Sequence, residues 1–214
     1  MDRWKNAIVL SFICIFIFVF PFYISLAFSG SYQTYLPIIF KSVGSTIPVK
    51  CEASSTSGYI TCIDDKGNIE VEVPNYWTDV IGGSWIFDDY DIGVSISAAP
   101  SLSEFKNNHD AEGVFISASN NFAQIGGYIE FLDYYTNAYR GDCTLEGRFS
   151  YDDGLYRGKY DRYSNCGING YAAYILCAVD KVDPTSKLIL IQIQVYPDDT
   201  TTVLHILGSF KIFY

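Results

Sequence analysis

Stretches in which apolar and polar residues alternate, separated by clusters of turn-forming residues, recur along this chain from residue 68 onward. In the first, Ile69, Val71 and Val73 alternate with polar residues, as in a strand buried on one face. Further strands are predicted at residues 91–98, 113–119, 144–151, 156–163, 171–179 and 188–196. Residues 171–179 are continuously apolar, which predicts a central strand buried on both faces.

Three other segments carry helical signals. Residues 101–104, Ser-Leu-Ser-Glu, form a capping box that opens a short helix. Residues 122–135 place apolar side chains near helical spacing, and Asp198-Asp199 can cap a last helix. Because hairpin turns join neighbouring strands, the predicted fold class is α+β, an antiparallel β-sheet with helices packed on it.

The N-terminus looks like an export segment. Arg3 and Lys5 precede Ala7 to Phe28, a run that is almost wholly apolar and carries no charge. The run is long enough to span a membrane, yet Ala27-Phe28-Ser29 is an acceptable cleavage site, so a cleaved signal peptide and a retained anchor both stay open. Either reading predicts a protein secreted or anchored on the outer face of the cytoplasmic membrane. The expected organisation is a signal peptide or anchor at 1–29, a spacer at 30–44, a disulfide-closed β-hairpin region at 45–75 and an α+β domain at 76–214.

Five of the six cysteines follow the apolar run, and disulfides are the default in an exported chain. A turn cluster lies near the midpoint between Cys51 and Cys62, and another between Cys143 and Cys166. Each pair is therefore predicted to close the base of a hairpin. Cys177 lies in an apolar strand and is expected to stay unpaired. No clustered Cys or His spacing is present, so no metal site is predicted.

The net charge of the chain and its sequence motifs disfavour several classes of function. The chain has 14 Lys and Arg against 24 Asp and Glu, a net charge of -10, which disfavours nucleic acid and anionic membrane surfaces. No phosphate-cradling loop occurs, so no cofactor is expected.

A Ser–His–Asp enzyme needs a histidine within reach of a nucleophile, and the chain has only His109 and His205. No Gly-x-Ser-x-Gly elbow is present. Residues 82–85, Gly-Gly-Ser-Trp, read as a turn before a strand, and His205 as a partly exposed residue of the last helix. A non-enzymatic protein is therefore predicted, with a secreted hydrolase whose site lies near His109 as the alternative.

Two segments resemble a known family. Glu72-Val73-Pro74-Asn75-Tyr76-Trp77 is similar to the opening of PsbP-like domains, the fold of an extrinsic subunit of photosystem II. Ile206-Leu207-Gly208-Ser209-Phe210 resembles the end of the last helix of that fold. The resemblance implies an antiparallel sheet sandwiched by helices.

The second half, about residues 85 to 214, also resembles a domain appended to secreted bacterial trypsin-like serine proteases. The matching stretches are residues 112–119, 142–148, 153–161 and 165–167. The resemblance supports the pairing of Cys143 with Cys166. The protease itself is absent from this chain, so no catalytic residues carry over.

The hairpin from Cys143 to Cys166 is the predicted recognition surface. Strand alternation places Tyr156 and Tyr160 on one face and Tyr163 on the other, so one face is expected to pack on the core. Tyr163 and Asp161 are then expected to face solvent, and the predicted ligand-binding residues are Tyr163, Asp161, Tyr156 and Tyr160. The expected partner is an extracellular protein or glycan, with the membrane as a further partner if the N-terminal segment is uncleaved. A glycan- or calcium-binding module using the Tyr- and Asp-rich hairpin is a second alternative.

Overall fold

The computed structural model describes residues 49–213 apart from 108, 110 and 122–125. The predicted signal peptide or anchor, the spacer and the first residues of the hairpin region lie outside these residues. Within the described residues, no helix combines the length and apolar character needed to cross a membrane.

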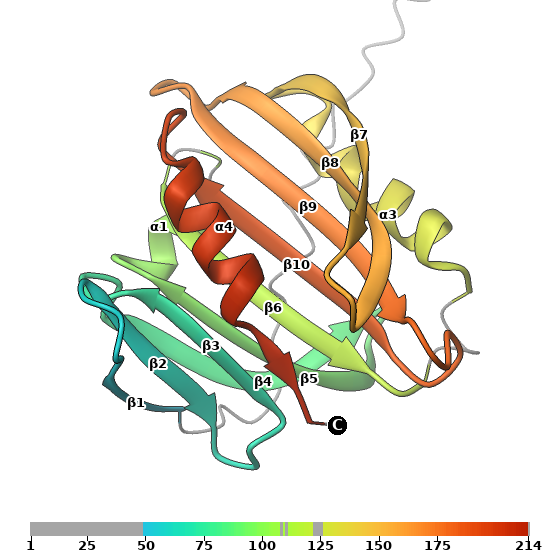
Figure 1. Cartoon of the computed structure of the whole chain (residues 1–214). Helices are drawn as coiled ribbons and strands as arrows, with labels where there is room; N and C mark the ends of the chain where they lie inside the picture. The colour runs from blue at the N-terminus through green and yellow to red at the C-terminus, as the bar shows by residue number, and fades with distance from the viewer. Residues whose placement is uncertain (1–48, 108, 110, 122–125, 214) are drawn as a thin grey trace, which may run out of the picture. The chain divides into compact units, whose positions relative to one another are not determined.

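One antiparallel sheet of seven strands dominates the described residues (Figure 1). Each hairpin turn joins strands that pair, and the long apolar strand formed by residues 171–180 lies near the middle of the order. From one edge to the other the strands are β4 (Asp79–Phe87), β5 (Tyr90–Ala99), β6 (Gly113–Ser119), β10 (Leu188–Val195), β9 (Tyr171–Asp180), β8 (Tyr156–Cys166) and β7 (Thr144–Asp152).

A smaller sheet holds the disulfide-closed hairpin. Within the described residues its order is β1 (Val49–Ala53), β2 (Tyr59–Asp64), β3 (Ile69–Pro74) and β11 (Lys211–Ile212). Because β11 pairs with β3, residues from both ends of the described chain meet in one sheet.

Two of the helices begin at their predicted caps. In α1 (Leu102–Asn107) the Glu104 amide donates to the Ser101 hydroxyl at 3.4 Å, and in α4 (Thr200–Ser209) the Thr202 amide donates to Asp199 at 3.1 Å. The described part of the middle segment forms α3 (Tyr128–Thr136), followed by the short 3-10 helix η2 (Asn137–Tyr139).

The inner strands of the large sheet, β5, β6, β10 and β9, are buried on both faces. On one face the apolar side chains of the sheet pack against α4 and the small sheet, and on the other against α1, α3 and η2. This three-layer arrangement explains why β9 is buried along nearly its whole length. It agrees with the predicted α+β class of an antiparallel sheet with helices packed on it.

Strand β4 was not predicted, and the assignment of residues 82–85 to a turn is wrong. Gly82 and Trp85 lie inside β4, and both are buried. Two adjacent glycines interrupt the alternation of apolar and polar residues by which strands are predicted. For this reason the sequence pattern did not indicate β4. The turn falls instead at Asp88 and Asp89, whose φ angles of 48° and 65° suit a tight hairpin.

The predicted disulfides are confirmed. Cys51 lies directly opposite Cys62 and is bonded to it, and Cys143 is bonded to Cys166. Cys177 is free and buried, and burial raises the pKa of its thiol well above the usual value.

Candidate functional site

Tyr163 does not face solvent. Its side chain is 1% exposed on the helix side of the sheet, where it stacks on Tyr139 with ring centroids 5.3 Å apart. Its hydroxyl donates to the Thr136 carbonyl oxygen at 3.3 Å. The prediction of a solvent-facing Tyr163 is therefore wrong, because α3 and η2 cover the face that alternation assigned to water.

Asp161 is buried as well, with 2% of the residue exposed. Arg148 donates to its two carboxylate oxygens at 2.6 and 2.8 Å and also reaches Asp133 of α3 at 2.7 Å. Arg148 of β7 thus ties β8 to α3 through the two carboxylates. The prediction that this carboxylate faces solvent is also wrong.

The other two predicted residues lie on the face that carries α4. Tyr156 is 5% exposed and stacks on Phe210 at 5.6 Å. Tyr160 is partly exposed and stacks on Phe149 at 5.3 Å. Of the four predicted ligand-binding residues, Tyr160 alone reaches solvent to an appreciable degree.

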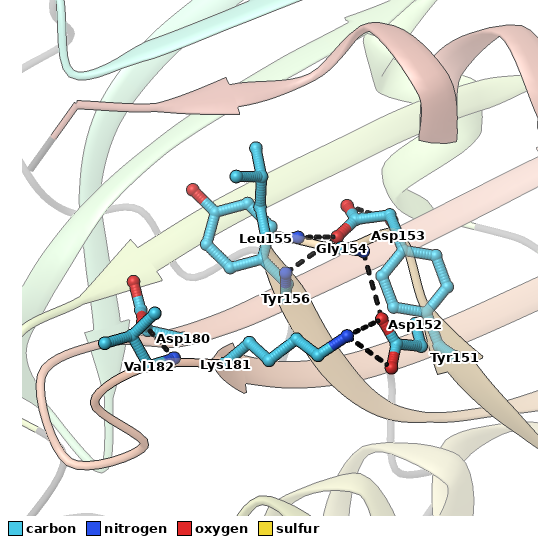
Figure 2. A network of polar contacts seen from close by, with 9 residues as sticks. All are labelled: Tyr151, Asp152, Asp153, Gly154, Leu155, Tyr156, Asp180, Lys181 and Val182. Atoms are coloured by element: carbon cyan, nitrogen blue, oxygen red, sulfur yellow. Dashed lines mark hydrogen bonds and ion pairs between the residues drawn. The ribbon is translucent and has the colours of Figure 1, made fainter.

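In the acidic turn of this hairpin, both carboxylates accept hydrogen bonds from nearby backbone amides (Figure 2). Asp152 accepts from the Gly154 amide at 3.0 Å and pairs with Lys181 at 2.7 Å. Asp153 accepts from the amides of Leu155 and Tyr156 at 2.8 and 2.7 Å. These are the bonds of an Asx turn, so turn geometry accounts for both carboxylates. Among the described residues, no three His, Cys, Asp or Glu side chains gather closely enough to hold a metal ion.

His109, the centre of the alternative hydrolase site, is 7% exposed. Its Nδ1 lies 3.3 Å from Asp142, and its ring stacks on Tyr139 at 4.4 Å. Within the described residues its Nε2 has no hydrogen-bond partner, so no hydroxyl or thiol nucleophile contacts it there. Burial lowers the pKa of His109, and the nearby Asp142 carboxylate only partly offsets this effect.

We expect the lowered pKa of His109 to make the fold acid-sensitive. Since the folded pKa lies below the unfolded value of about 6.5, the unfolded chain binds the proton more readily. The stability that neutral His109 contributes is therefore fully present above the unfolded pKa. It is lost as the pH falls toward the folded pKa. Melting temperatures between pH 7.5 and 5 should fall more steeply for the wild-type protein than for His109→Gln. Parallel profiles would contradict a buried neutral His109.

A polar pocket lies where α4 packs beside β3. Its volume is about 400 Å³. Most of its lining side chains carry hydrogen-bonding groups, and the exposed Leu204 lies at its edge. The lining residues are Glu70, Glu72, Leu204, His205, Gly208, Ser209 and Lys211.

The central pair of this pocket is Glu72 and His205. The His205 Nε2 lies 2.7 Å from the Glu72 carboxylate, and the Tyr59 ring stacks on His205 with centroids 3.6 Å apart. Burial opposes ionisation of Glu72, but hydrogen bonds from Ser54, His205 and Thr56 outweigh it and lower its pKa. Glu72 is therefore a carboxylate at neutral pH.

Two further contacts shape the pocket. Lys211 of β11 pairs with Glu70 at 2.6 Å, and the Ser209 hydroxyl accepts from the Glu72 amide at 3.1 Å. The pocket thus offers positioned carboxylate, imidazole, ammonium and hydroxyl groups, which suits a ligand that both donates and accepts hydrogen bonds. From the sequence, His205 was assigned to the surface and Glu72 to the polar face of a strand. No local sequence pattern indicated that these two residues are in contact.

No family model matches this chain, and no curated protein matches it. The solution structure of cyanobacterial PsbP from Synechocystis sp. PCC 6803 is similar to it, with a TM-score of 0.41 and 17% sequence identity. The match covers 77% of this chain and 98% of that chain. It concerns the fold alone. The resemblance to the protease-appended domain stays a prediction.

Proposed function

We propose that this protein is an exported or membrane-anchored, non-enzymatic binding module of the cell surface. The observation that carries the proposal is the pocket between α4 and β3, with its fixed polar lining. The apolar N-terminal run supports export, and the two disulfides are compatible with an oxidising compartment.

The ligand that fits this pocket is a polar molecule with several hydroxyl or amino groups, such as the sugar units of an extracellular glycan. Lys211 neutralises Glu70, and His205 is a hydrogen-bond partner of Glu72, so both carboxylates already have a partner within the protein and the pocket suits a neutral ligand. Each paired group retains hydrogen-bonding capacity toward the pocket, because a carboxylate accepts at several positions and an ammonium group donates three bonds.

Gly208 provides a test that leaves the charged groups intact. A Cβ atom built there meets nothing within 4 Å, so a side chain enters open space rather than the fold. We expect Gly208→Phe to fill the pocket and weaken binding at least tenfold, whereas Gly208→Ala keeps binding and stabilises the helix by up to about 1 kcal/mol. A glycan array followed by calorimetry with the bound sugars gives the measurement.

The matched pair separates blocked binding from misfolding, because both variants change the same position. Equal affinity of Gly208→Phe and Gly208→Ala for a bound glycan would place the site elsewhere. A wild-type protein that binds no glycan or amino sugar would overturn the assigned ligand class.

A further inference from the structure

The hairpin formed by β1 and β2 reaches the central pair of the α4–β3 pocket. The Tyr59 ring, at the start of β2, stacks on His205 with centroids 3.6 Å apart. Ser54 and Thr56, in the turn between the two strands, hydrogen-bond to the Glu72 carboxylate. The central pair is therefore held from outside the pocket by a third segment, in addition to α4 and β3.

The two sides of this turn are fastened differently. On the β2 side, the Gly58 carbonyl oxygen accepts from the Asn75 amide at 2.9 Å, which ties the turn to the end of β3. On the β1 side, the Ser54 amide donates to the Tyr59 carbonyl oxygen at 3.3 Å, and the Thr56 amide donates to the Ser54 hydroxyl at 2.9 Å. The two hydroxyl groups that reach the pocket thus lie on the side that continues from β1.

Strand β1 has little besides its disulfide to hold it. Among the described residues it pairs with β2 alone, and residues 50–53 are exposed. Cys51 lies directly opposite Cys62 and is bonded to it. Two paired strands with little buried surface are marginally stable in water, so the covalent link keeps β1 and the beginning of the turn in place.

We propose that the Cys51–Cys62 disulfide controls the organisation of the α4–β3 pocket, and through it the affinity for a ligand. While the disulfide is intact, the turn holds the Glu72 carboxylate beside His205. Reduction frees β1 together with the two turn hydroxyls, so the carboxylate loses two hydrogen-bond donors and moves more freely. The effect on affinity rests on the proposed function, whereas the release of Glu72 does not.

The accessible end of this disulfide is Cys51, which is exposed, whereas Cys62 is 0% exposed. A dithiol reductant supplies the two electrons. Its first thiolate attacks the Cys51 sulfur and expels the Cys62 sulfur, and its second thiol then displaces Cys51 from the mixed disulfide. Each released cysteine takes up one proton given up by the reductant, so the products are two cysteine thiols and one reductant disulfide.

Two matched double variants of the full chain in detergent, each lacking one disulfide, test the proposal. Cys51→Ser with Cys62→Ala removes the link at the turn. Cys143→Ser with Cys166→Ala removes a link whose hairpin contributes no residue to the pocket lining. NMR titration of the Glu72 side-chain carboxyl carbon, assigned with Glu72→Gln, reports on the pocket without any ligand.

The expected result is a change in the pKa of Glu72. Burial raises this pKa, but hydrogen bonds from Ser54, His205 and Thr56 together lower it below the usual value. Since the first double variant loses the two turn donors, its Glu72 pKa should rise. The pKa should stay unchanged in the second double variant.

Two turn variants separate this effect from unfolding, because both retain the disulfide. Ser54→Ala with Thr56→Val removes both hydroxyls and should also raise the pKa of Glu72. Ser54→Thr with Thr56→Ser retains both hydroxyls and should titrate as the wild-type protein does.

Calorimetry with the tightest-binding oligosaccharide of the glycan array measures the consequence for affinity. Dithiothreitol added to the Cys143→Ser, Cys166→Ala variant should weaken binding about tenfold, the effect of losing one hydrogen bond to a charged group, and reoxidation should restore it. An unchanged Glu72 titration after loss of the Cys51–Cys62 link would overturn the proposal, as would a shifted titration with unchanged affinity. If the wild-type protein binds no sugar, the proposed function fails, and the Glu72 titration alone decides whether the disulfide controls the pocket.

Discussion

Replacing Tyr163 with alanine is expected to lower the free energy of unfolding by about 3–5 kcal/mol. The ring is fully buried between the sheet and η2, and its removal leaves a cavity beside Tyr139 that the surrounding backbone cannot fill. The Thr136 carbonyl oxygen also loses its donor. Urea denaturation with the disulfides intact gives the measurement.

Tyr163→Phe is the matched control, since it retains the ring and removes only the hydroxyl. We expect it to cost about 1 kcal/mol, the usual net contribution of one hydrogen bond. Tyr160→Ala, at a partly exposed ring, should cost less than Tyr163→Ala. A loss below 1 kcal/mol for Tyr163→Ala would mean that this side chain faces water after all.

Arg148→Met is expected to destabilise the fold by about 3 kcal/mol, because it leaves the buried Asp161 carboxylate without its partner. The double variant Arg148→Met with Asp161→Leu removes both charges and should recover most of that loss. Thermal and urea unfolding of the single and double variants complete the comparison.

Arg162→Met provides the control on the same hairpin. Arg162 also pairs with a carboxylate, Glu146, but their side chains are 37% and 33% exposed. Exposed pairs contribute about 0–1 kcal/mol, so this variant should be nearly neutral. If Arg148→Met proves equally neutral, Asp161 does not depend on its arginine.

Most of the fold was predictable because its strands are periodic and its turns carry strong chemistry. Residues 113–119 form β6 as predicted, and residues 171–179 form nearly all of β9. The cysteine pairs followed from the turns between them. Strand β4 was not predicted because Gly82 and Gly83 contribute no side chains to an alternating pattern. Strand β11 was not predicted because a strand of two residues is too short to show a period.

The candidate site was not predictable in the same way. Alternation separates the two faces of a strand, but it does not say whether the second face meets water or another layer. For Tyr163 and Asp161 that layer is α3 with η2, on a segment that precedes the hairpin in the chain. The pocket has the same difficulty, since Glu72 and His205 are 133 residues apart and only the finished fold brings them together.

The pairing of β11 with β3 has a consequence for the order of folding. Lys211 and Glu70, which face each other there, are separated by 141 residues. The small sheet therefore cannot be completed until nearly the whole domain has been synthesised, because its last strand, β11, lies at the end of the described residues. Contacts of such long range slow folding, because a large loop must close before it gains any stabilising contact. Until then the edge of β3 stays unpaired, and this interval is when the chain is most open to mispairing with a neighbour.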